Sequence, residues 1–143
     1  MQFSAILSIF SLVAGALSQT SGAGKAGYDS VYGNGSTPML SLACSDGPNG
    51  LYTKGYTDLS ALPAFPRVAA TETVVGWNSE KCGMCYTLTW RGRNVSVLAV
   101  DHAVSGFVLS LSALDMLTHG QGVAFGTVDI TWQEDVPAKC DFF

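Results

Sequence analysis

The sequence predicts a mainly β fold, organised as a barrel rather than a sandwich. Three observations support this. Beyond residue 18 the chain consists of five or six short strand-like segments separated by Gly, Pro and Asn. Only one or two short helical segments interrupt them. All four cysteines lie in the same part of the chain, as expected for a small domain held by disulfides. A short helix among several strands is typical of a barrel.

The first eighteen residues are interpreted as a secretory signal peptide. An uncharged apolar run extends from Ala5 to Leu17, which is too short to span a bilayer. Small residues at Ala16 and Ser18 precede a cleavage site that would leave Gln19 as the first mature residue, with a cut after Ala16 as the alternative. The segment lacks the usual Lys or Arg at its start, and a buried N-terminal helix is the competing interpretation. We therefore expect one secreted domain over 19–143, without membrane insertion.

The strand-like segments differ in how clearly they are marked. Residues 20–27 are small and glycine-rich and predict a loose N-terminal arm. Residues 86–90 alternate large and hydroxyl side chains, turn residues occupy 91–94, and 95–100 return as a β-branched run, which predicts a hairpin. Residues 125–133 alternate again. This pattern predicts a strand in which Val128, Ile130 and Trp132 share one face.

Two helical segments are expected. Ser112 and Asp115 fit a capping box, and Gly120 ends the helix. Leu114 and Leu117 are expected to face the core, with Met116 as a further candidate. A shorter helical turn is expected over 58–62, before Pro63.

The cysteines predict two disulfides and no metal site. An even number behind a signal peptide favours disulfides, although four cysteines allow three pairings. The pair Cys82 and Cys85 has C-x-x-C spacing, but it runs into a strand and not into a helix N-terminus that would activate a thiolate. Cys44 and Cys140 stand alone, which does not match the second close pair of a zinc site. No cofactor is expected.

The charge pattern argues against nucleic acid as a partner. The formal net charge is −4, and the seven basic residues are scattered along the chain. A polyanion binder needs Lys and Arg gathered on one face. Only Arg91 and Arg93 come together, at the tip of the predicted hairpin.

Two carboxylates and two sequons are candidates for function. Asp101 ends a predicted strand, and Asp46 lies in a glycine-rich loop. Glycoside hydrolysis needs a pair of such groups, but Asp46 also suits a turn and Asp101 suits a strand end that binds nearby N–H groups. Asn34 and Asn94 begin N-x-S sequons and are candidate glycosylation sites.

Several motifs together resemble the cerato-platanin family of small secreted fungal proteins, over essentially the whole mature chain. In order, these are Tyr28-Asp29-Ser30-Val31-Tyr32, Leu42-Ala43-Cys44-Ser45-Asp46-Gly47, Gly76-Trp77-Asn78-Ser79, Cys82-Gly83-Met84-Cys85-Tyr86, Val100-Asp101-His102-Ala103, Gly106-Phe107, Leu117-Thr118-His119-Gly120-Gln121 and Gly126-Thr127-Val128.

The resemblance implies both a fold and a function. The family has a six-stranded double-psi β-barrel like the first domain of expansins, and it would pair Cys44 with Cys82 and Cys85 with Cys140. Its members are secreted or wall-bound, bind chitin or N-acetylglucosamine oligomers, and act as elicitors, immunomodulators or allergens. Chitin oligomers and a host immune receptor are therefore the expected partners, and self-association is a further expectation.

The resemblance also argues against catalysis. Related glycosidases carry an acidic residue where this chain has Val108, and the family more often carries Asn there. A valine cannot donate a proton, so Asp101 lacks an evident catalytic partner. We therefore expect no enzymatic activity and no catalytic residue.

The expected ligand groove lies on the open face of the barrel. The resemblance assigns to it five polar residues and two aromatic ones: Ser45, Asp46, Asn78, Asp101, Ser105, Tyr28 and Phe107. Two alternative functions stay open. One is a cryptic polysaccharide-active enzyme that uses Asp101 and Asp46. The other is a surface-active, self-assembling wall protein, consistent with 48% hydrophobic residues.

Overall fold

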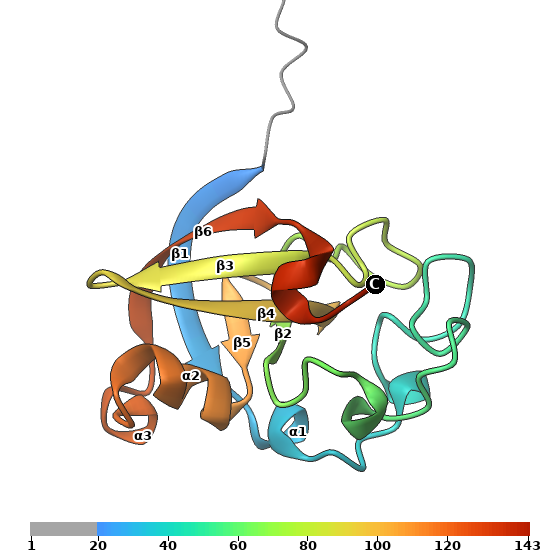
Figure 1. The fold of residues 1–143 in the computed structure, drawn as a ribbon, viewed down its shortest axis with the longest axis horizontal. Coiled ribbons are helices and arrows are strands. Elements are labelled where there is room, and N and C mark those ends of the chain that lie inside the picture. Colours follow the sequence, from blue (N-terminus) through green and yellow to red (C-terminus); the bar gives the residue numbers. More distant parts are fainter. Residues whose placement is uncertain (1–19) are drawn as a thin grey trace, which may run out of the picture.

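The barrel is closed and has six strands. The computed structural model describes residues 20–143, so the predicted signal peptide over 1–18 lies outside the described residues. The strands are β1 (Ser21–Tyr28), β2 (Val68–Thr71), β3 (Cys85–Trp90), β4 (Arg93–His102), β5 (Phe107–Leu109) and β6 (Val128–Asp135). Their order around the barrel is β1-β5-β2-β4-β3-β6 (Figure 1). The predicted six-stranded barrel is confirmed.

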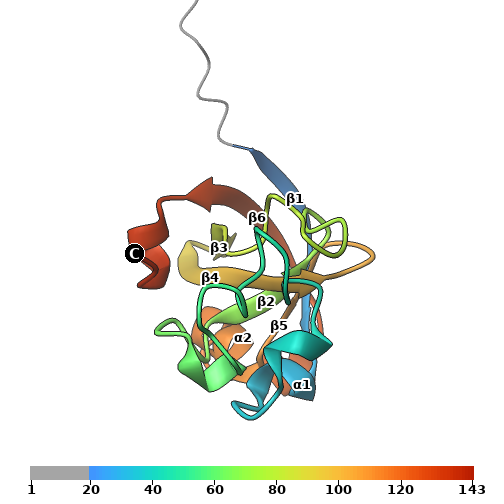
Figure 2. The same ribbon diagram turned by 90° about the vertical axis from the view of Figure 1, so that its right-hand side faces the viewer.

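The helical elements are short and lie outside the barrel. They are α1 (Ser30–Gly33), α2 (Leu111–Thr118), α3 (Gly122–Phe125) and three 3-10 turns at Met39–Ser41, Leu59–Ala61 and Pro137–Cys140. Helices α2 and α3 cover one side of the barrel, whereas long connecting segments occupy the opposite side (Figures 1 and 2). The turn at 59–61 agrees with the one predicted over 58–62, while α1 and α3 were not predicted.

The predicted loose arm is instead the strand that closes the barrel. Strand β1 pairs antiparallel with β6, from Ser21 opposite Gln133 to Ala26 opposite Val128. It also pairs in parallel with β5. A Cβ atom added at Gly22 would lie 2.8 Å from the Trp132 side chain. The glycines that suggested flexibility therefore permit close approach of β1 to an aromatic core.

Three aromatic rings fill the centre of this core. Tyr86, Phe107 and Trp132 contact one another edge-to-face, with ring centroids 5.4–5.7 Å apart. Such contacts add about 0.5–1.5 kcal/mol per pair beyond simple burial. Val128 and Ile130 are buried on the same face of β6 as Trp132, which confirms the alternation predicted for this strand.

The predicted hairpin is present with a tighter turn. Strands β3 and β4 pair up to Trp90 opposite Arg93, so that only Arg91 and Gly92 form the loop. Their φ angles are +46° and +77°. Two successive positive φ angles define a type I′ turn, whose twist matches that of the flanking strands.

Helix α2 begins two residues earlier than predicted. The hydroxyl of Ser110, and not that of Ser112, accepts a hydrogen bond from Ala113 N at 3.1 Å. Asp115 does not reach back to the helix start, because its carboxylate accepts a bond from Gly122 N at 2.9 Å. The proposed capping box is wrong, although Leu114 and Leu117 are buried as expected. Met116 is not part of the core, because its side chain lies on the solvent side of the helix and the residue is 43% exposed.

Both disulfides have the pairing that the family resemblance implied. Cys44 is bonded to Cys82, and Cys85 is bonded to Cys140, so no free cysteine exists among the described residues. The first bridge joins two long connecting segments, and the second fastens the C-terminal turn to β3. Within residues 20–143 no helix is long and apolar enough to cross a membrane.

Candidate functional site

Three connecting segments meet at one end of the barrel, where β2 and β4 end and β3 and β5 begin. They comprise residues 44–51, 72–79 and 103–106, and we call them the loop face. Ala103 N donates to Thr71 O at 3.1 Å, and Glu72 N donates to Gly106 O at 3.0 Å. Cys44 N donates to Val100 O at 3.3 Å. Backbone hydrogen bonds thus fasten the first and third segments to the barrel and the second segment to the third.

The loop face carries an exposed aromatic side chain, that of Trp77, which is 62% exposed. Its Nε1 donates to Asp46 Oδ1 at 2.7 Å. A Cβ atom added at Gly47 would lie 2.9 Å from the indole, so only a residue without a side chain permits this packing. The ring is therefore held in a fixed position although it faces solvent.

A second contact locks the same two segments together. The Asn78 side-chain oxygen accepts from Asn49 N at 2.9 Å, and Asn49 Nδ2 donates back to Asn78 O at 3.1 Å. Asn78 has a φ of +58°, a left-handed conformation that asparagine tolerates better than most residues. Ser45 Oγ is 3.3 Å from Asp46 Oδ1. The structure thus brings the predicted residues Ser45, Asp46 and Asn78 together around Trp77.

The carboxylate of Asp46 is an exposed hydrogen-bond acceptor. The hydrogen bond from the Trp77 indole lowers the pKa of Asp46, and bonds from its own backbone and from Ser45 act in the same direction against a smaller opposing effect of burial. The group is consequently ionised at neutral pH. It is suited to accept hydrogen bonds and unsuited to donate a proton.

Asp101 is engaged in internal contacts. Its Oδ2 accepts from the Tyr32 hydroxyl at 2.7 Å, and its Oδ1 accepts from Ala43 N at 2.8 Å. Burial, followed by the bond to Asp101, raises the pKa of Tyr32 well above its usual value. Asp101 therefore joins α1 and the segment before Cys44 to the end of β4.

Two other predicted residues lie beside a second depression. Tyr28 in β1 and Ser105 in the third segment of the loop face line a depression of about 350 Å³ between β1 and β5, which Phe107 and Val108 also line. Tyr28 is 36% exposed, whereas Phe107 is only 1% exposed because its ring belongs to the barrel core. The ring of Phe107 therefore offers little surface to a ligand, and its assignment to the groove stays a prediction. Trp77, which the sequence analysis quoted only as part of a motif, is the exposed aromatic residue beside the polar cluster.

The sequon residues Asn34 and Asn94 are both exposed. Asn34 Oδ1 accepts from Ser36 N at 3.0 Å, and Asn94 Oδ1 accepts from the Thr89 hydroxyl at 2.7 Å. Among residues 20–143, no three His, Cys, Asp or Glu side chains gather in a group able to hold a metal ion.

The closed barrel with its loop face defines the class of expansin-like double-psi β-barrels. An expansin from Clavibacter michiganensis has the same fold, with a TM-score of 0.55 at 20% identity over 82% of this chain and 51% of the expansin. A structure of a variant of that expansin contains cellohexaose.

Closer relatives identify the family. The cerato-platanin family model matches residues 25–142. Cerato-platanin 3 from M. perniciosa superposes with a TM-score of 0.81 at 42% identity, over 85% of this chain and 100% of that protein. The allergen Asp f 15 of Aspergillus fumigatus is 42% identical over 79% of this chain and 74% of the relative. The heat-stable 19 kDa antigen of Coccidioides posadasii is 37% identical over 79% and 77%, respectively. The chain belongs to the cerato-platanin family.

Proposed function

We propose that this protein is a secreted, non-catalytic carbohydrate-binding module that recognises chitin or N-acetylglucosamine oligomers through its loop face. The observation that carries the proposal is the pair formed by Trp77 and Asp46, an exposed indole held by an ionised carboxylate. Membership of a family of small fungal proteins that resemble expansins supports secretion and sugar binding.

The chemistry of the pair suits a neutral sugar. A pyranose ring presents an apolar face that packs on an aromatic ring, while its hydroxyl and N-acetyl N–H groups need acceptors. Trp77 offers the ring, and Asp46 offers an acceptor whose second oxygen is free of side-chain bonds among the described residues. Because the indole is already held in place, binding costs little side-chain entropy.

The same groups argue against hydrolysis. A general acid must hold a proton near neutral pH, but the pKa of Asp46 is lowered. Both oxygens of Asp101 accept internal hydrogen bonds, and Val108 occupies the position expected for the acid. Neither Asp46 nor Asp101 is therefore suited to act as the general acid that the alternative enzymatic mechanism requires.

The direct test is titration of the protein with chitin oligomers, followed by amide NMR signals, with cellohexaose as a second probe. Trp77→Ala should weaken binding at least tenfold, because the exposed ring supplies the stacking surface. Phe143→Ala is the matched control, since it removes another exposed aromatic ring (99% exposed) that belongs to neither concave surface. Equal loss of affinity in both variants, or no shifts at the loop face, would contradict the proposal.

Recognition by a host immune system is the proposed biological consequence. Relatives that match over three quarters of this chain carry the names antigen and allergen. Stimulation of immune cells by wild-type protein and by Trp77→Ala, compared at equal concentration, tests whether sugar binding and immune recognition use the same surface. Absence of any response to the folded wild-type protein would contradict this part of the proposal.

Self-association is a second candidate function, and two exposed apolar side chains support it. Val75 and Val104 are 80% and 94% exposed on the same loop face as Trp77. Sedimentation of the wild type and of a Val75→Ser, Val104→Ser variant over a range of concentrations would reveal it. Concentration-dependent association that the double substitution abolishes would support assembly through these side chains, and a monomer at all concentrations would exclude it.

A further inference from the structure

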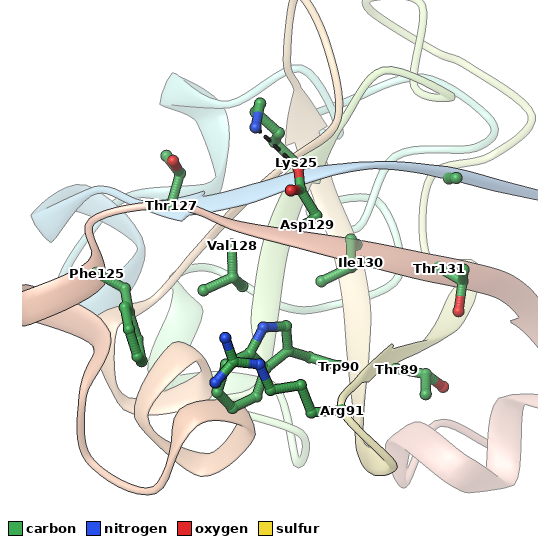
Figure 3. Close-up of a pocket in the computed structure, with 11 residues that line it drawn as sticks. Lys25, Thr89, Trp90, Arg91, Phe125, Thr127, Val128, Asp129, Ile130 and Thr131 are labelled. Carbon is green, nitrogen blue, oxygen red and sulfur yellow. Dashed lines mark hydrogen bonds and ion pairs between the residues drawn. The ribbon is translucent and has the colours of Figure 1, made fainter.

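A second concave surface lies outside the loop face, on the outer side of β1, β6 and β3. Figure 3 shows the side chains around it. The cavity has a volume of about 660 Å³, within the range of small-ligand pockets. Three threonines, Thr89, Thr127 and Thr131, are among its lining residues. We call this surface the Arg91 groove.

One end of the Arg91 groove is formed by a cation stacked on two aromatic rings. The guanidinium of Arg91 lies 4.5 Å from the centroid of Trp90 and 6.0 Å from that of Phe125. The two rings contact each other, with centroids 5.6 Å apart. Figure 3 shows Arg91 lying across Trp90. Stacking uses the face of the guanidinium and leaves the N–H groups at its edge available for a planar anion.

No carboxylate within the described part of the chain forms an ion pair with this cation. Among residues 20–143, Arg91 forms no ion pair, although the protein carries an excess of acidic residues. Asp129 also lines the groove, but it is paired with Lys25 at 2.8 Å. Arg93 is turned toward α2, where it donates to Met116 O at 3.0 Å. The groove therefore presents one unpaired positive charge.

The backbone at Arg91 adds an independent observation. Arg91 is the first central residue of a type I′ turn and has a φ of +46°. Asn is strongly preferred there, and a long side chain is uncommon. Local turn preference therefore does not explain an arginine at this position, whereas binding through its side chain would explain it.

We propose that the Arg91 groove binds a uronate residue of an acidic oligosaccharide. The sugar carboxylate forms a bidentate pair with Arg91, the geometry that guanidinium favours. The threonine hydroxyls interact with the hydroxyl groups of the same or the next sugar. A single fixed cation beside neutral hydroxyls suits a chain with isolated carboxylates better than a densely charged polyanion. This site is distinct from the proposed chitin site on the loop face.

The test measures calorimetric binding of de-esterified galacturonate oligomers to the protein. Arg91→Asn removes the cation and places the preferred residue in the turn, so that the hairpin is retained. It should weaken binding at least tenfold, and Arg91→Lys should weaken it less, since the charge remains without the planar fork. Lys54→Asn removes an equal charge, that of a lysine near Phe142, and should change affinity less than twofold.

Three further measurements complete the test. Fully methyl-esterified oligomers should bind at least tenfold more weakly than the acid form, and the affinity of the acid form should fall as salt is raised. Trp77→Ala should leave binding of the acid form unchanged. The proposal is overturned if the wild type does not bind the acid form, if Arg91→Asn and Lys54→Asn have equal effects, or if the methyl ester binds equally well.

Discussion

Hydrogen bonds distinguish an exposed carboxylate, that of Asp46, from one that holds the fold together, that of Asp101. Asp46 accepts a bond from an exposed indole, and Asp101 accepts bonds from Tyr32 and from the backbone of Ala43. The sequence alone favours a turn role for Asp46 and leaves Asp101 open between a structural and a functional role, and the family resemblance assigns both to the ligand groove. Their partners come from segments distant in the chain, so that only the folded structure distinguishes them.

The pH dependence of the Trp77 indole signal provides a first prediction. Because the pKa of Asp46 is lowered in the folded protein, its contribution to stability is present above the pKa of the unfolded chain, about 3.9. That contribution is lost as pH falls through the lower folded value. The indole N–H resonance of Trp77 should therefore shift with a midpoint below about 3.9. Asp46→Asn should abolish the transition, and a midpoint at or above 3.9 would contradict the assignment.

A second prediction concerns Asp101. Asp101→Ala leaves the buried hydroxyl of Tyr32 without its partner, which should lower the free energy of unfolding by about 1–3 kcal/mol. Affinity for chitin oligomers should change less than it does in Trp77→Ala. Tyr32→Phe is the matched control, because it removes the hydroxyl together with its need for a partner and should cost less. Strongly reduced affinity at unchanged stability would instead place Asp101 in the ligand site.

At the level of elements, the sequence predicts strands with alternating large residues well and fails where small residues form a strand. The hairpin and β6 were predicted because Val95, Val97, Val128 and Ile130 alternate with polar residues. Strand β1 was missed because its Gly and Ala residues carry no such signal. Its strand conformation is imposed by pairing with β6 and β5. The same limit applies to the helix cap, since Ser110 and Ser112 differ only in tertiary surroundings.

A third prediction tests β1 through its glycines. Gly22→Ala should destabilise the protein by about 1–3 kcal/mol, the usual cost of overpacking, because the new Cβ would lie 2.8 Å from Trp132. Gly24→Ala should have little effect, since its Cβ would meet only Gly106 Cα at an ordinary 3.8 Å. Denaturant unfolding of both variants measures the difference. Similar stabilities would indicate that residues 21–24 are only loosely attached.

Across the whole molecule, one disulfide stabilises the loop face and the other stabilises the barrel. Cys44–Cys82 joins the segment that carries Asp46 to the segment that follows Trp77, and Cys85–Cys140 fastens the C-terminal turn. The family resemblance predicted both pairs. Spacing alone did not, because Cys82 precedes β3 and Cys85 is its first residue, and only the folded chain brings each of them to a different partner.

A fourth prediction concerns the separate roles of the two disulfides. Replacing either cysteine pair with alanines should lower the free energy of unfolding by about 2–5 kcal/mol. Only loss of Cys44–Cys82 should also weaken binding of chitin oligomers, because that bridge positions Asp46 and Trp77. Thermal unfolding and titration of both double variants test this. Equal affinity loss in both would show that the bridges act only through global stability.

The pairing of β1 with β6 has a consequence for synthesis. These strands lie at opposite ends of residues 20–143, yet they are direct neighbours in the barrel. A chain that is made from its N-terminus cannot close this sheet until β6 has left the ribosome. Cys140 emerges after β6. Barrel closure therefore cannot precede synthesis of β6, the second disulfide cannot form before Cys140 has emerged, and such long-range pairing makes folding intrinsically slow.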